Sequence, residues 1–236
     1  MKNRYVVGMA VLSLCLGTAA AQAQYYAYLP EGAGPTFRLG VGPSFFQDGK
    51  LTQFSGSGIP TTGPVPSTVD YNTGLAFDAA LGWAFNQYVA LDFETGFIGA
   101  EINNVPGYST DNSRMYNVPF MANVTLSYPI PRTNIIPYIG AGIGGSDMIF
   151  DSDNFAQNSS GITVSGSEND VVFAGQLFAG VRFRITRHLA FDLGYKYFAT
   201  DRPTFSYPEF GGGPNLNVGF RGARTHSALL GLTFDF

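Results

Sequence analysis

Apolar residues alternate with small or polar residues along eight segments of the chain. In the last segment the even positions from Ala228 to Phe236 are apolar, and the positions between them include Gly231, Thr233 and Asp235. A period of two is typical of a β-strand whose two faces meet different surroundings. The pattern predicts strands at 36–47, 71–85, 89–99, 114–128, 135–146, 170–185, 189–200 and 223–236.

The connections between these segments alternate in length. Short ones cover Asn86–Tyr88, Pro129–Asn134 and Thr186–His188, and long ones cover 48–70, 100–113, 147–169 and 201–222. Outer-membrane barrels have short periplasmic turns and long outer loops. The sequence therefore predicts an all-β fold, an eight-stranded antiparallel up-and-down transmembrane β-barrel with both ends in the periplasm.

Two short turns predict the register of the strands that they join. A three-residue loop at 86–88 and another at 186–188 bring apolar residues opposite apolar residues on one face. The expected pairs are Phe85 with Val89, Trp83 with Leu91, Leu81 with Phe93, Phe77 with Phe97, Ile185 with Leu189, Phe183 with Phe191 and, facing inward, Arg182 with Asp192.

The same alternation directs charged residues into the lumen. An eight-stranded barrel is only wide enough for its side chains to fill it, and buried charges must be paired. Because four cations meet five anions, we expect a salt-bridge network that plugs the barrel; a proton or solute path is the alternative. The residues are Arg38, Asp78, Asp92, Glu94, Arg182, Arg184, Asp192, Lys196 and Asp235.

Aromatic residues gather near the predicted periplasmic strand ends. Amphipathic rings settle at membrane interfaces, so we interpret them as an aromatic girdle before we consider ligand stacking. The girdle residues are Trp83, Phe85, Tyr88, Tyr128, Tyr138 and Phe183.

The first 23 residues are typical of a secretory signal peptide. Lys2 and Arg4 precede an apolar run of about eleven residues, too short for the roughly twenty of a transmembrane helix, and small residues follow. Residues 24–35 are expected to form a periplasmic lead-in, and 36–236 the barrel domain. Cys15, the only cysteine, lies in the signal peptide, so the mature barrel has no disulfide.

Composition narrows the function classes. The formal net charge of −4 is unfavourable for binding the phosphate backbone of nucleic acid, so we do not expect nucleic acid as a partner. No stretch after the signal peptide has eighteen consecutive apolar residues, which excludes a helical membrane protein.

The chain resembles the small outer-membrane β-barrel proteins of the OmpA-like and opacity-protein kind. The resemblance rests on Pro137–Gly144 (PYIGAGIG), on Leu189–Tyr197 (LAFDLGYKY) and on the terminal strand. It implies a location in the outer membrane, contact with its lipid and lipopolysaccharide, and a signal for the barrel-assembly machinery at Leu232, Phe234 and Phe236.

Candidates for catalysis and metal binding are weak. Asp92 and Glu94 share one strand face without an inward histidine nearby, and His226 and Ser227 are adjacent, so they point to opposite faces of a strand. The acidic segment 147–155 lacks the glycine and glutamate of an EF-hand. A solvated acidic loop, or a loop that shares divalent ions with lipopolysaccharide phosphates at the outer rim, is the more ordinary interpretation. We expect no enzyme activity, no cofactor and no metal.

The leading hypothesis is a structural and surface-interaction barrel. Its outer loops would face a ligand on a host or another cell. A narrow channel for small or apolar solutes is the first alternative, and an outer-membrane lipid-modifying enzyme is the second. The choice among these functions depends on analogy with the family, because a fold does not imply a function.

Overall fold

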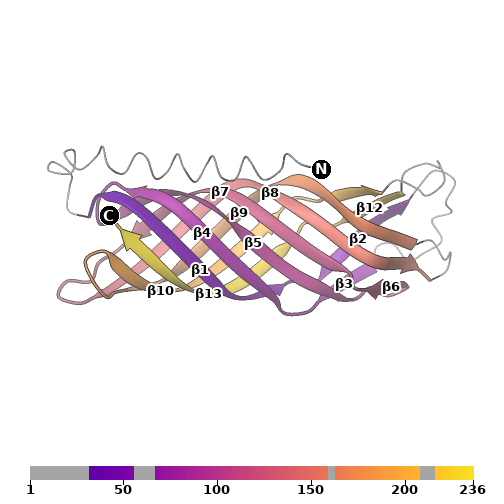
Figure 1. Cartoon of the computed structure of the whole chain (residues 1–236), viewed down its shortest axis with the longest axis horizontal. Coiled ribbons are helices and arrows are strands. Elements are labelled where there is room, and N and C mark those ends of the chain that lie inside the picture. Colours follow the sequence, from indigo (N-terminus) through magenta and orange to yellow (C-terminus); the bar gives the residue numbers. More distant parts are fainter. Residues whose placement is uncertain (1–31, 56–66, 159–162, 208–215) are drawn as a thin grey trace, which may run out of the picture.

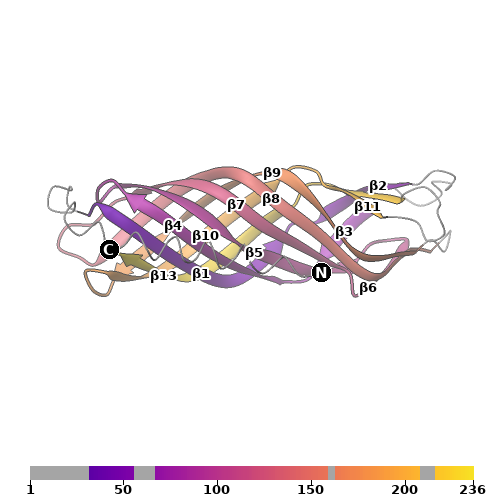
Figure 2. The ribbon, with the colours of Figure 1, turned by 45° about the horizontal axis from the view of Figure 1, so that its top comes forward.

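The computed structural model describes residues 32–55, 67–158, 163–207 and 216–236, which form thirteen strands of one antiparallel up-and-down sheet. Among these residues, no helix is long and apolar enough to cross a membrane. The predicted signal peptide and most of the predicted lead-in lie outside the described residues. The long strands tilt around one axis (Figures 1 and 2).

Eight strands overlap the predicted ranges. Their bounds are β1 (Gly34–Phe46), β4 (Gly74–Ala84), β5 (Val89–Asn104), β7 (Arg114–Ser127), β8 (Ile135–Gln157), β9 (Thr163–Arg184), β10 (Leu189–Thr200) and β13 (Arg224–Asp235). Of these, β5, β8 and β9 extend beyond the predicted ranges into the segments predicted as loops.

Each of these strands has an antiparallel partner on both edges. The pairs are β1 with β4, β4 with β5, β5 with β7, β7 with β8, β8 with β9, β9 with β10, β10 with β13 and β13 with β1.

The two predicted hairpin registers are confirmed. Leu81 lies opposite Phe93, and the Phe85 amide donates to the Val89 carbonyl at 2.9 Å. In the other hairpin, Arg182 lies opposite Asp192. The apolar pattern alone was sufficient here, because a slip of one residue would exchange the two faces.

The predicted strand number is wrong, because the long connections are not simple loops. They contain β2 (Gly49–Ser55), β3 (Ser67–Tyr71), β6 (Tyr108–Asp111), β11 (Thr204–Tyr207) and β12 (Leu216–Phe220). With the extended ends of β5, β8 and β9, these strands form what we call the outer region, at the end of the barrel away from the C-terminus (Figure 1).

An apolar core explains why the outer region forms strands. Its alternate residues are apolar and point inward, where they shield one another from water. Seven are aromatic, and several ring pairs lie 5–6.5 Å apart, such as Phe150 with Phe220 at 5.1 Å. The buried residues, the outer core, are Leu51, Phe54, Val69, Ile102, Val105, Tyr108, Met115, Met148, Phe150, Phe155, Val172, Phe205, Tyr207, Leu216, Val218 and Phe220.

Below the outer region the packing is inverted, with apolar side chains facing outward. Leu81 and Phe93, a cross-strand pair, are 55% and 56% exposed. On β8 the inversion occurs within one strand, because Ile139 and Ile143 are exposed whereas Met148 and Phe150 are buried. An exposed apolar band of this kind is expected where a barrel wall faces lipid.

A charge placed in this band should destabilise the barrel according to its depth. We expect Leu81→Arg to lower the free energy of unfolding by about 2–4 kcal/mol, and Phe85→Arg, near the strand end, by about 0–1 kcal/mol. Urea titration of the protein in lipid vesicles, followed through Trp83, measures both. Equal losses in the two variants would show that Leu81 does not lie near the bilayer centre.

Candidate functional site in the barrel interior

Glu94 is at the centre of the interior and has no accessible surface. Its carboxylate accepts from Lys196 Nζ at 2.5 Å and from Arg38 Nη2 at 3.0 Å. The side-chain amides of Asn123 and Gln176 donate to the same carboxylate, each at 3.2 Å. Two cations and two amides from four strands therefore satisfy this one buried charge.

Two further carboxylates extend the cluster around Glu94. Asp78 accepts from Lys196 Nζ at 2.5 Å. Asp92 accepts from Asn123 Nδ2 at 2.7 Å and Thr125 Oγ1 at 3.3 Å, and it lies 3.4 Å from Arg38 Nη2. Each carboxylate thus has a charged partner, and Arg38 and Lys196 each bridge two acids.

A separate ion pair joins β9 and β10. Arg182 Nε donates to Asp192 Oδ1 at 3.0 Å, and Thr233 Oγ1 donates to Asp192 Oδ2 at 2.6 Å. The Arg182 guanidinium also lies over the Tyr138 ring, 5.5 Å from its centroid. A stacked and paired guanidinium has little freedom to move.

The last two predicted lumen residues lie outside these contacts. Arg184 and Asp235 line a cavity of about 600 Å³ at the end of the barrel where the C-terminus lies. Neither side chain forms an ion pair within the described part of the chain. The structure therefore brings seven of the nine predicted residues into ion pairs and leaves two at the mouth.

Tyr138 is not a girdle residue. Its ring lies inside the barrel, because Ile139 faces outward and Tyr138 takes the opposite face. Phe85, Tyr88, Tyr128 and Phe183 are exposed, and Trp83, opposite Leu91 on the outward face, is half-buried. Their role as an interfacial girdle stays a prediction.

The uncharged polar residues of the interior were not among the residues predicted from the sequence. Asn123, Gln176, Thr125 and Thr233 hold the carboxylates with hydrogen bonds. Each occupies an inward position of a strand that was predicted correctly. A polar residue at an inward position of a predicted strand was the signal that could have identified them.

The acidic segment 147–155 is not a solvated loop. It belongs to β8, where Met148, Phe150 and Phe155 are buried in the outer core. Tyr207 Oη donates to the Phe150 carbonyl at 2.8 Å, and burial raises the pKa of this tyrosine. The alternation of acids with buried apolar residues is that of a strand with one face in water.

The two residues considered for acyl transfer lie on opposite faces. Ser227 is buried on the inside, whereas His226 lies outside and contacts Tyr195 Oη at 2.5 Å and Gln47 Nε2 at 2.7 Å. Within the described ranges, no group of three or more histidine, cysteine, aspartate or glutamate side chains is arranged to hold a metal.

Similar sequences occur in Brucella. An uncharacterized protein of Brucella suis is 25% identical over 197 residues, which cover 69% of this chain and 69% of that protein. An uncharacterized protein of Brucella melitensis matches to the same extent.

Solved structures with this fold include two outer-membrane proteins. OprG from Pseudomonas aeruginosa has a TM-score of 0.55 at 13% identity, covering 88% of this chain and 99% of that chain. The outer membrane protease OmpT from Escherichia coli has a TM-score of 0.50 at 7% identity, covering 86% and 97%. At these identities the likeness concerns the fold alone.

The family model agrees with the fold and with the outward-facing apolar band. It describes the outer membrane protein β-barrel domain and matches residues 9–236, nearly the whole chain. The chain therefore belongs to this family of outer-membrane β-barrel proteins.

Proposed function

We propose that the protein is a plugged outer-membrane barrel with a structural and surface-interaction role. In this proposal β1, β4, β5, β7, β8, β9, β10 and β13 form a closed eight-stranded wall. The support is that each of these strands is paired on both edges, including β1 with β13. Closure leaves no unpaired backbone groups in lipid.

The buried cluster around Glu94 is the observation that carries the proposal of a plug. Its charged atoms lie 2.5–3.4 Å apart and come from four strands around the barrel, β1, β4, β5 and β10. An eight-stranded barrel is just wide enough for its side chains to fill it, and the cavity of about 600 Å³ at one end reaches as far as Arg38 and Asp92 of this cluster. Above the cluster, the outer core fills the interior of the outer region with apolar side chains.

The outer region then provides the interaction surface. We propose that the short turns face the periplasm, that the outer region faces a host or another cell, and that lipid and lipopolysaccharide surround the wall. Packed strands hold this surface more rigidly than loops would, which favours a preorganised binding face. A binding partner on a host or another cell is proposed because the outer region is exposed and, in this orientation, faces away from the periplasm.

Export and assembly are part of the same proposal. Residues 1–23 would direct export and be removed. The barrel-assembly machinery would recognise the last strand through Leu232, Phe234 and Phe236, of which Leu232 and Phe236 are exposed.

The outer core favours a second candidate function, a channel for small or apolar solutes. Its sixteen buried apolar residues offer an apolar solute a surface free of charge. The core is filled by its own side chains, so solutes could pass only if these moved. A lipid-modifying enzyme is favoured by no contact among the described residues.

Loss of the central carboxylate should destabilise the barrel strongly. Glu94→Gln leaves Lys196 and Arg38 with too little negative charge, so we expect unfolding to become about 3–5 kcal/mol easier. Glu101→Gln is the matched control, because Glu101 is 58% exposed and also pairs with arginine, at 3.2 Å from Arg114; its expected cost is about 0–1 kcal/mol. Denaturant titration in vesicles measures both, and similar costs would contradict a central role for Glu94.

Ion conductance separates the plug from an open pore. We expect the refolded protein to show no steady conductance in a planar bilayer, and Arg182→Ala and Asp192→Ala to lower stability without opening it. Steady conductance of the wild type that changes in ion selectivity with either substitution would overturn the plug.

Uptake of an apolar fluorophore tests the second candidate. Phe150→Ala removes a large side chain from the outer core, and a channel through this core should then admit the probe several-fold faster. If the barrel is plugged, liposomes carrying the wild type or the variant take up the probe at the rate of protein-free liposomes. Fluorescence inside the liposomes reports the rate.

A further inference from the structure

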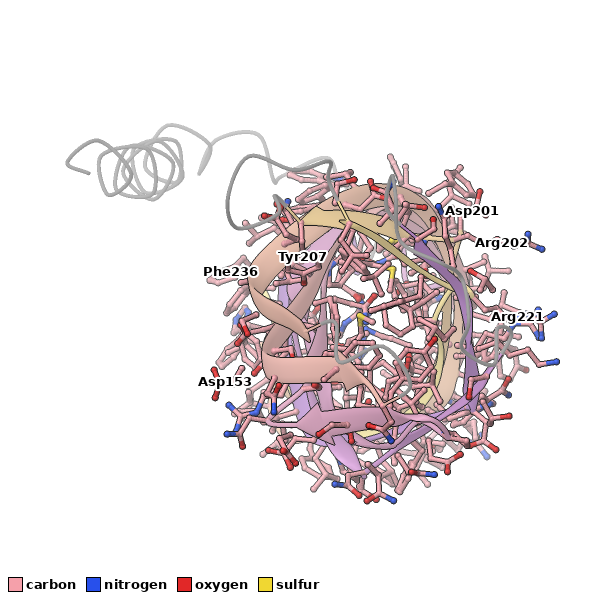
Figure 3. All side chains as sticks on the ribbon, turned by 90° about the vertical axis from the view of Figure 1, so that its right-hand side faces the viewer. Asp153, Asp201, Arg202, Tyr207, Arg221 and Phe236 are labelled. Atoms are coloured by element: carbon pink, nitrogen blue, oxygen red, sulfur yellow. The ribbon has the colours of Figure 1, made fainter. Side chains whose placement is uncertain are left out.

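The cations of the outer region that form no ion pair gather on one flank of the described structure, away from the acids of β6 and β8. The acids of β6 and β8 are Asp111, Asp147, Asp151 and Asp153. Four cations lie on another flank, at β2, beyond β10, beyond β12 and at the start of β13. Viewed from the outer end, Arg202 and Arg221 project from the side opposite Asp153 (Figure 3). The four cations, which we call the basic flank, are Lys50, Arg202, Arg221 and Arg224.

Backbone contacts bring these cations together from distant parts of the chain. The Arg221 amide donates to the Lys50 carbonyl at 2.7 Å. The neighbouring Phe220 amide donates to the carbonyl of Pro203, next to Arg202, at 3.2 Å. Arg224 lies one step below, opposite Ala199 in the β10–β13 ladder. The fold thus places four positive charges along adjacent strand ends.

The cations of the basic flank are not engaged in ion pairs in the described part of the chain. All four side chains are exposed, and none forms an ion pair within the described ranges. The acids near them are Asp48, Asp70, Asp170 and Asp201, so the flank has as many carboxylates as cations. Two of these carboxylates accept from backbone amides instead, Asp170 from Thr204 and Asp201 from Arg202, each at 2.9 Å. By contrast, Arg114, which is also in the outer region, is paired with Glu101.

The flank lies at the edge of the lipid-facing band. Directly below Arg224, His226 is hydrogen-bonded on the outer face between Tyr195 and Gln47. Tyr195 and its lower neighbours are exposed apolar or aromatic side chains, and Phe173, whose carbonyl accepts from the Asp201 amide, is 63% exposed. Hydrogen-bonded aromatic groups above an apolar wall are typical of the membrane interface. The cations are therefore at the level of lipid headgroups.

We propose that the basic flank binds the phosphate groups of an outer-leaflet glycolipid of the lipid A kind. Arginine suits this ligand, because its planar guanidinium can donate two parallel hydrogen bonds to a phosphate. The acyl chains would lie on the wall beside Phe173 and Tyr195. The inference rests on the orientation proposed above, and it names a specific lipid site where that proposal gives only general contact.

The test compares two triple variants of equal charge in the refolded full chain. Arg202→Gln with Arg221→Gln and Arg224→Gln removes the basic flank. Arg114→Gln with Arg132→Gln and Arg187→Gln removes three cations elsewhere. The probes are diphosphorylated lipid A and dephosphorylated lipid A, added to the protein in detergent micelles. Unchanged gel mobility of the unboiled protein confirms that each variant is folded.

We expect the first variant to bind diphosphorylated lipid A about tenfold or more weakly than the wild type, and the second to stay within about twofold. If both variants lose the same affinity for diphosphorylated lipid A, the effect is general charge attraction and the proposed site is wrong. Equal binding of the dephosphorylated lipid would overturn recognition of phosphate. Binding of a soluble sulfated oligosaccharide without binding of lipid A would overturn the lipid as ligand.

A labelling experiment tests the proposed orientation of the barrel separately from the lipid site. Asp153→Cys lies in the outer region, and a membrane-impermeant thiol reagent should label it on whole cells. If labelling fails, the proposed orientation is wrong. If labelling succeeds and lipid A binding is unaffected by the first triple variant, the orientation stands and the lipid site alone is wrong.

Discussion

Backbone amides and carbonyls find no hydrogen-bond partner in hydrocarbon, so every strand that crosses a membrane must be paired on both edges. In this chain the first long strand and the last satisfy one another, because β1 pairs with β13 from Thr36 opposite Asp235 to Phe46 opposite Thr225. The pairing of strands about 190 residues apart in sequence fixes where every intervening strand lies. It also fixes which residues share the interior.

The narrow interior makes buried charge both necessary and costly. Side chains from opposite strands meet there, and an unpaired carboxylate would lose its hydration without compensation. The chain places Glu94 between Lys196 and Arg38 and adds two amides, so that no charge in the cluster is isolated. Such a cluster contributes specificity of register as much as stability, because a slipped strand would separate its charges.

Sequence predicted the wall well because lipid imposes a simple alternation. The alternation predicted the eight long strands except for the outer ends of β5, β8 and β9, and together with the short turn at 186–188 it predicted the pairing of Arg182 with Asp192. Tyr138 was assigned to the girdle from its place near a strand end, although the parity of β8 put its ring inside. The amides of Asn123 and Gln176 were missed because only charged residues were followed inward.

The outer strands were missed for a different physical reason. Outside the membrane the preferred pattern reverses, since the outer face meets water and the inner face must be dry. Residues 147–155 lack an apolar outward face and were therefore predicted to form a loop. Their apolar residues, Met148, Phe150 and Phe155, lie on the inner face instead. The register shift between Ser152 and Phe155 further obscured the period of two.

The reversal of pattern along one continuous strand has a consequence for interactions. On β8, exposed Ile143 and buried Met148 are five positions apart, which is two and a half periods of the alternation, so the lipid boundary falls between them. The wall below this boundary carries apolar side chains on its outer face, and the basic flank and the acids of β6 and β8 both begin above it. The wall therefore sets the height at which charges meet headgroups, while strand order sets the side of the barrel on which the basic flank lies. A ligand that is fixed in the membrane and carries phosphate can satisfy both constraints at once on the basic flank, whereas a soluble anion has no need of the apolar wall below it.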